Sequence, residues 1–314
     1  MEFSNYLDLP FKAGIGVGYS GYRLRDGTSE QGSKDVAIGL GIDYFVRFGF
    51  GYTFRSLTST VPGANPQSPS SPPVMHNAKL PADNLGAIFE IPVVGMISKL
   101  NNRSVQIGDG IRPMFDITVG ASDKNIGDEV NYSNADQALP LPRQSVLGWS
   151  LRGGVETLQE GHDWHLLTLT RAREASDILA TQTVLTAGTT AVCSFGYEKG
   201  FGIIQPLENL VLGKTNGQIT LGRGWEIDAA DLLYLRWGSD TGPGELIYST
   251  SGWSVKLDGM LRLLTTGRII PPGTPVIEFL TNHLDLEYSF AKYYSSVNQG
   301  IDWTKFSSLT LVVR

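Results

Sequence analysis

The chain has very little of three features that decide fold and partner: cysteine, long apolar runs and basic clusters. Its single cysteine, Cys193, excludes an internal disulfide and every cysteine-based metal cage. No window of about 18 or more consecutive apolar residues occurs, which excludes a transmembrane helix. A formal charge of −6, with no basic run longer than a dipeptide, argues against a nucleic-acid partner. Residues 1–10 lack a basic and an apolar segment, so no signal peptide is predicted there.

Glycine, aromatic and hydrophobic residues are abundant instead. The 314 residues include 37 glycines, 41% are hydrophobic and 10% are aromatic. Such a chain is too apolar to remain disordered, and its glycines lack the period of collagen. The composition therefore indicates a folded, non-fibrous protein.

Hydrophobic residues recur at every second position, which is the period of a β-strand. The clearest examples are the ranges Arg47–Arg55, Phe115–Gly120, Trp253–Leu263 and Leu284–Ala291. Further strands are predicted over Phe11–Leu24, Val36–Tyr44, Ser145–Leu158, Trp164–Ala172, Thr190–Lys199, Gln218–Trp225, Leu232–Gly238 and Phe306–Val313. Weaker strands, each with a proline, are predicted over Leu85–Gly95 and Phe201–Leu212. Helical periodicity is nearly absent, and one short helix is predicted over Asp177–Leu185.

No linker or fixed repeat divides the chain, so residues 1–314 are predicted to form one domain. The range 58–84 contains six prolines among serine, glycine and asparagine. Because proline cannot pair in a central strand, this range is predicted to form one long surface loop.

Two architectures fit about 14 (12–14) amphipathic antiparallel strands: a soluble sandwich or barrel, and a membrane barrel. Three features favour the all-β, antiparallel transmembrane β-barrel. The strands are long, full charges lie in mid-strand, and aromatic residues such as Trp237 and Trp303 lie near strand ends.

In that architecture the two faces of each strand have different surroundings. The residues predicted to face the lumen are Arg47, Arg55, Asp116, Arg152, Lys256, Asp258, Asp285 and Glu287. The residues predicted to face lipid are Phe48, Phe50, Tyr52, Phe54, Trp253, Leu257, Leu284, Leu286, Tyr288 and Phe290.

Segments of the chain also resemble the PorV-type, FadL-like outer-membrane barrels of the Bacteroidetes and related phyla. The resemblance lies in Leu139–Arg143, Val146–Ser150, the strand ending at Glu156, the turn and strand Glu160–Thr170, and the closing pair His283–Tyr294 and Thr304–Leu311. It covers roughly the last two thirds of the chain. It implies a partner in type IX secretion or a conduit for hydrophobic small molecules. The chain departs from the family because its first strand is expected already at Phe11, where such barrels carry a plug segment, and its last residue is Arg314.

Motifs that could carry chemistry are weak. Gly16–Gly21 matches G-x-G-x-x-G but lies inside an alternating strand, so no nucleotide site is predicted. His162–His165 could supply metal ligands from one turn, but no further ligand is near in sequence, so no metal is predicted. Asp285 and Glu287 are expected in a solvated lining of mixed charge; a cation-preferring or substrate-contacting ring is the alternative. No Ser-His-acid grouping exists, so we expect no cofactor, no catalytic residue and no enzyme.

The function predicted from the sequence is that of a scaffold, docking partner or conduit in the outer membrane of a Gram-negative-type bacterium. Its expected partners are membrane lipid and other proteins of the envelope or of a secretion complex, with no nucleic acid. The alternative is a soluble all-β structural subunit of an extracellular or viral assembly, in which Phe48, Phe50, Tyr52 and Phe54 face a protein core.

Overall fold

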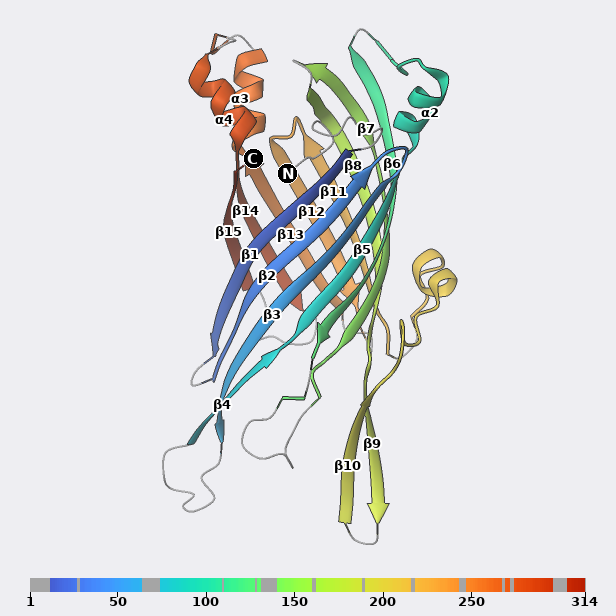
Figure 1. Ribbon diagram of the computed structural model, residues 1–314, viewed down its shortest axis with the longest axis vertical. Helices are drawn as coiled ribbons and strands as arrows, with labels where there is room; N and C mark the ends of the chain where they lie inside the picture. Colours follow the sequence, from blue (N-terminus) through green and yellow to red (C-terminus); the bar gives the residue numbers. More distant parts are fainter. Residues whose placement is uncertain are drawn as a thin grey trace. The chain divides into compact units, whose positions relative to one another are not determined.

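The computed structural model describes most of the chain (Figure 1). The described residues are 12–26, 29–63, 74–108, 110–127, 129–130, 140–159, 162–187, 190–215, 218–242, 247–266, 269–271, 274–295 and 304–313. Contacts divide the chain into two compact units. Unit 1 contains Met1–Phe89, Gly120–Leu147 and Ser176–Gln205, and unit 2 contains Glu90–Val119, Gly148–Ala175 and Pro206–Arg314.

Strands make up most of the described chain. They are β1 (Lys12–Asp26), β2 (Ser29–Asp43), β3 (Arg47–Gly63), β4 (Val74–Pro81), β5 (Asp83–Pro92), β6 (Ile111–Ile126), β7 (Gln144–Gln159), β8 (His162–Ile178), β9 (Ala180–Ala187), β10 (Thr190–Tyr197), β11 (Thr220–Ala229), β12 (Leu233–Thr241), β13 (Ile247–Lys256), β14 (Leu284–Ser295) and β15 (Thr304–Val313). Within the described residues, three short α-helices accompany them: α2 (Val93–Asn101), α3 (Leu257–Thr266) and α4 (Pro275–His283). One π-helix, η2, spans Pro206–Val211.

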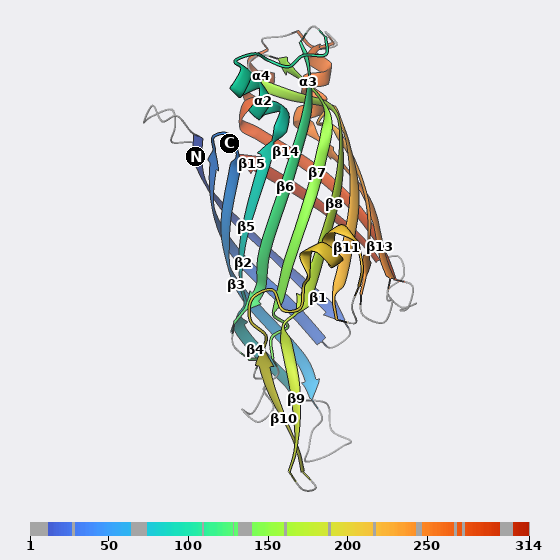
Figure 2. The same ribbon diagram turned by 90° about the vertical axis from the view of Figure 1, so that its right-hand side faces the viewer.

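The main sheet is an up-and-down meander of 13 strands in the order β1-β2-β3-β5-β6-β7-β8-β11-β12-β13-β14-β15, with β4 paired to β3. The paired ladders of β1–β2, β2–β3 and β11 to β15 are antiparallel. The remaining two strands, β9 and β10, form a separate antiparallel hairpin (Figure 2). The predicted antiparallel all-β fold class is confirmed, and the 15 strands of the described chain are one more than the highest number predicted.

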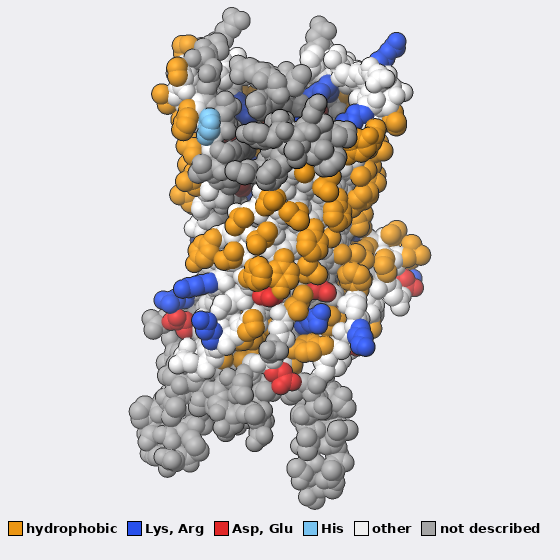
Figure 3. Space-filling view, in the orientation of Figure 1, with side chains coloured by type: hydrophobic (Ala, Val, Ile, Leu, Met, Phe, Trp, Pro, Cys, Tyr) orange, Lys and Arg blue, Asp and Glu red, His pale blue; other side chains and the backbone are white. Residues whose placement is uncertain are grey.

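Burial in the main sheet is inverted relative to a water-soluble protein. Along β2 the side chains of Val36, Ile38, Leu40 and Ile42 are exposed, whereas Asp35 is buried. Figure 3 shows hydrophobic side chains gathered over β1 to β3, with charged side chains mainly toward one end of these strands. We call the face that carries exposed alternate hydrophobic residues the apolar face, and the opposite one the polar face.

The alternation seen in sequence explains how the two faces arise. The ladder between β2 and β3 pairs Leu40 with Phe50 and Ile42 with Phe48, so hydrophobic side chains meet in cross-strand rows. The intervening positions pair glycine with glycine, as in Gly41 with Gly49. This segment therefore has a bulky apolar face and a polar face with little side-chain volume.

Buried apolar side chains are few for a sheet of this size. A cluster of them lies beside β4 and consists of Ala78, Leu80, Ala82 and Leu141, with Leu57 and Val130 packed against it. Aspartates and serines are buried elsewhere, with Asp228 and Ser254 both fully buried. The bulky hydrophobic side chains of the apolar face therefore do not pack into an apolar core.

Three sequence predictions of secondary structure are wrong. The helix predicted over Asp177–Leu185 is the end of β8 followed by β9, because its threonines and valine favour a strand. The weak strand over Phe201–Leu212 contains turns and η2, which begins at Pro206, a residue that cannot donate to a ladder. The strand predicted over Trp253–Leu263 ends at Lys256, and α3 begins at Leu257.

Because α3 begins where a strand was predicted, two predicted site residues are placed differently from the prediction. Leu257, expected on a lipid-facing strand, is the first residue of a helix, and Asp258, expected in the lumen row, is buried in its first turn. Leu257 and Leu261 are spaced for one helix face as well as for one strand face, so the pattern alone was ambiguous. The Asp258 carboxylate also accepts a hydrogen bond from the backbone N–H of Gly259.

The loop predicted over 58–84 is shorter than expected. Residues as far as Gly63 belong to β3, and Val74–Pro81 returns along it as β4, pairing Ser56 with Pro81. Proline is tolerated there because β4 pairs with one strand only. Residues 64–73 of the predicted loop lie outside the described residues. In the described part of the chain, no helix is long and apolar enough to cross a membrane.

Candidate functional site

Unit 2 concentrates charged side chains on the polar face of β11 to β14. Arg236 forms an ion pair with Glu226 and a second, at 3.5 Å, with Glu287. Lys256 lies 4.0 Å from carboxylate oxygens of both Asp285 and Glu287. The predicted lumen residues Lys256, Asp285 and Glu287 are therefore brought together, and Arg236 joins them although the sequence did not single it out.

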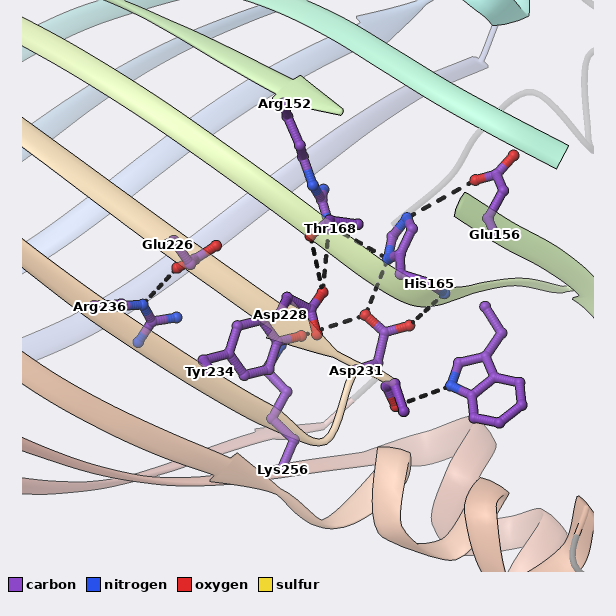
Figure 4. Close-up of polar contacts among 12 residues, drawn as sticks. Arg152, Glu156, His165, Thr168, Glu226, Asp228, Asp231, Tyr234, Arg236 and Lys256 are labelled. Carbon is purple, nitrogen blue, oxygen red and sulfur yellow. Dashed lines mark hydrogen bonds and ion pairs between the residues drawn. The ribbon is translucent and has the colours of Figure 1, made fainter. Parts of the chain in front are cut away.

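A second cluster, centred on His165, joins β8 to the turn between β11 and β12 (Figure 4). The Nδ1 of His165 lies 2.9 Å from Asp231 Oδ1, and the backbone N–H of His165 donates to Asp231 Oδ2 at 3.0 Å. The hydroxyl of Tyr234 donates to Asp231 Oδ1 at 3.3 Å. The neighbouring Trp164 indole donates to the Ala230 carbonyl at 2.9 Å. Four contacts thus hold this turn in place.

The carboxyl group of Asp231 lies in the turn and is largely enclosed. Burial alone would raise its pKa, but the hydrogen bonds and charge of His165 outweigh burial, so the pKa of Asp231 lies below its usual value. An ionised Asp231 only accepts hydrogen bonds, which assigns the Nδ1 proton to His165.

The turn itself has an unusual backbone. Ala230 and Asp231 have φ values of 60° and 51°, and the N–H of Leu232 donates to the carbonyl of Ala229. Positive φ at both central residues is the geometry of a type I′ hairpin turn, in which glycine and asparagine are usual. Left-handed backbone at an alanine costs roughly 1–2 kcal/mol. The contacts of Asp231 with His165 and Tyr234 offset part of that cost.

Asp228 is the most enclosed charge in this cluster. Its side chain is fully buried, with one oxygen 3.6 Å from a guanidinium nitrogen of Arg152 and 3.5 Å from the Thr168 hydroxyl. Its other oxygen, Oδ1, has no hydrogen-bond partner. The predicted lumen residue Arg152 therefore lies where it compensates a buried carboxylate.

His165, Asp228 and Asp231 could offer ligands to a metal ion, because their ligand atoms lie within 4.8 Å of one another. Zinc requires ligands about 2.0–2.2 Å from the ion, so the three groups would have to approach one another. The guanidinium of Arg152 already supplies positive charge beside Asp228. As it stands, the cluster is a hydrogen-bonded group of charges that clamps the turn between β11 and β12 onto β8.

His165 belongs to a segment that could supply metal ligands, but neither aspartate is singled out by the sequence. No metal site was predicted at His162–His165, because no third ligand lies near in sequence. Asp228 and Asp231 arrive beside His165 only because β11 pairs next to β8 after the long connection 179–219. No local signal in the sequence indicates that pairing.

The remaining predicted lumen residues lie outside this cluster. Arg55 forms an ion pair with buried Asp35 at 2.8 Å, and Arg47 forms an exposed ion pair with Asp43 at 3.3 Å. Asp116 is half-buried on β6. Both arginines belong to unit 1.

The predicted lipid-facing residues mostly lie on the apolar face. Phe48, Phe50, Phe54, Trp253 and Tyr288 are exposed, by 40–52%. Tyr52, Leu284, Leu286 and Phe290 are half-buried. Trp253 packs against the rings of Tyr288 and Phe290 across the β13–β14 ladder, and the Tyr52 hydroxyl donates to Asp83. That these residues contact lipid stays a prediction.

Comparisons with known proteins give little further identification. No protein-family model matches the chain, and no curated protein matches it. Among solved structures, the chain is similar to the β domain of the Bordetella autotransporter BrkA, with 13% identity and a TM-score of 0.39, over 96% of this chain and 98% of that one. A similarity of this size carries no argument about function.

Proposed function

We propose that this chain is an integral β-barrel of a bacterial outer membrane that acts as a scaffold for other envelope proteins. The observation that carries the proposal is the inverted burial of the sheet. Hydrophobic side chains such as Leu40 and Phe50 are exposed, while Asp35 and Asp228 are buried on the polar face. In water this arrangement is unfavourable, whereas in a bilayer the hydrophobic face contacts lipid.

The dimensions of the strands support the same proposal. β1 and β2 have 15 residues each, and β3 and β8 have 17. At about 3.3 Å per residue, 15 residues extend about 50 Å, and a tilt of about 45° reduces their height to about 35 Å. That height is sufficient to cross a hydrocarbon core of about 30 Å.

The charged polar face favours a docking role over passage of hydrophobic molecules. A FadL-like conduit needs an apolar path, but the polar face of β11 to β14 presents Glu226, Arg236, Lys256, Asp285 and Glu287. The resemblance to PorV-type barrels supports docking of partners in protein secretion. The proposal includes no catalytic step.

The test is to express the chain behind a secretion signal and compare unboiled with boiled envelope fractions on a denaturing gel. A closed membrane barrel resists detergent until heated, because no strand edge is left open to attack. A heat-dependent mobility shift supports the barrel, and co-purification of envelope proteins with it supports docking. Recovery as soluble protein without a shift would overturn the proposal in favour of the soluble assembly subunit.

A further inference from the structure

Three arginines interrupt the apolar face of unit 2: Arg171 and Arg173 on β8, and Arg223 on β11. We call them the outward arginines. Alternation along β8 places the first two on the same face as exposed Leu167 and Leu169. β8 and β11 are neighbours in the sheet, so the three guanidinium groups belong to one region of that face.

Aromatic rings lie beside these arginines on the apolar face. Trp225 pairs with Trp237 across the β11–β12 ladder, and both are exposed. The next row on this face pairs Arg223 with Ser239, whose hydroxyl accepts a hydrogen bond from Arg223 Nε at 2.8 Å. The guanidinium of Arg171 lies 4.4 Å from the Trp225 ring centroid. From the membrane interior toward water, side chains are typically hydrophobic, then aromatic, then cationic.

The charges of the outward arginines are not neutralised by protein. Among the described residues none of the three forms an ion pair with a carboxylate, and like charges on neighbouring strands destabilise one another. Arg173 Nη1 donates to the carbonyls of Leu210 and Val211 in η2, at 3.3 and 3.0 Å. These two bonds use one of its nitrogens and supply no negative charge.

We propose that the outward arginines bind the phosphate of a phosphorylated lipid headgroup in the outer leaflet of the membrane. Guanidinium groups bind phosphate through paired, charge-assisted hydrogen bonds. The exposed Leu167 and Leu169 would lie beside the acyl chains, and η2 adds the exposed side chains of Leu207 and Val211. The long connection 179–219 follows β8, and long connections mark the outer end of membrane barrels. This inference rests on the proposed membrane location.

The experiment uses the chain purified from envelopes in a mild non-ionic detergent. The purified chain is titrated with phosphorylated lipid A and, separately, with the dephosphorylated lipid, and lipid binding is measured by native mass spectrometry. The test variant combines Arg171→Gln, Arg173→Gln and Arg223→Gln. The control is Arg23→Gln on β1, because this exposed arginine is already paired with Glu30 at 3.0 Å. Each preparation is also run unboiled and boiled on a denaturing gel.

The wild type and the control should bind phosphorylated lipid A in preference to the dephosphorylated form. The triple variant should bind it about a hundredfold more weakly, because each arginine near a charged lipid surface contributes roughly fivefold. If the triple variant shows the heat-dependent mobility shift but binds phosphorylated lipid A like the wild type, the lipid site is overturned and the barrel is not. Displacement by inorganic phosphate alone would also overturn it, by showing a site for soluble anions. Absence of the heat shift in the wild type would instead refute the membrane location on which the inference rests.

Discussion

The exposure of Phe50 on the apolar face gives a quantitative test of what that face contacts. Phe50 is 42% exposed near the middle of the hydrophobic row of β3, opposite Leu40, which is 52% exposed. If this row crosses the bilayer, Phe50→Arg places a charge near the midplane and costs about 2–4 kcal/mol. At a surface position in water, the same substitution costs about 0.5 kcal/mol or less.

The assay is urea unfolding of the chain reconstituted in lipid vesicles, followed by tryptophan fluorescence. The matched control is Thr53→Arg, which adds the same charge to the opposite face of the same strand, three residues further on. The control should cost less than about 1 kcal/mol, because the polar face already accommodates the ion pair of Arg55 with Asp35. Equal costs for the two variants, or none for Phe50→Arg, would refute the assignment of the apolar face to lipid.

Three further predictions concern the clamp around His165. Asp228→Asn should lower the free energy of unfolding by about 1–3 kcal/mol in the same urea assay, because it leaves a half-buried guanidinium unpaired. The lowered pKa of Asp231 predicts stability that is complete above its ordinary value of about 3.9 and is lost as pH falls through the lower folded value. Asp231→Asn should therefore flatten the acid limb of the stability profile. Gly259→Ala should displace α3 from the turn, because its Cβ would lie 2.3 Å from the Asp231 carbonyl oxygen, and backbone hydrogen exchange at the turn should accelerate.

Each of these has a result that contradicts it. An unfolding midpoint unchanged by Asp228→Asn would show that the Arg152 guanidinium does not need the Asp228 carboxylate for stability. An acid limb as steep in Asp231→Asn as in wild type would assign the pH dependence to other carboxylates. For Gly259→Ala the control is Gly16→Ala, where a Cβ meets nothing within 4 Å; equal exchange rates in the two variants would contradict the predicted contact.

The sequence predicted strand positions correctly where hydrophobic residues recur at every second position, which is the period of a strand. Phe48, Phe50 and Phe54 alternate with small or polar residues, and this alternation is compatible with a strand and with little else. The pattern failed at Leu257–Leu261, whose spacing suits both a strand and a helix. It also failed at β9, where a short segment without strong alternation acquires its conformation by pairing with β10.

The cluster around His165 could not be derived in the same way. The turn at Ala230 and Asp231 lacks the glycine or asparagine that signals a type I′ hairpin, so its positive φ values had no sequence signature. The contact between His165 and Asp231 joins residues 66 positions apart. Local propensity carries no information about such a contact, because it depends on which strands become neighbours.

The alternation of hydrophobic and polar residues was enough to predict an antiparallel β protein with one apolar and one polar face per strand, because a period of two residues is a local property of the backbone. Which charges meet depends instead on how the strands are arranged in three dimensions. The order of strands places β11 beside β8, so that Asp231 contacts His165 on the polar face and the outward arginines gather on the apolar face. Both results depend on strand order and register, which alternation within a single strand does not encode.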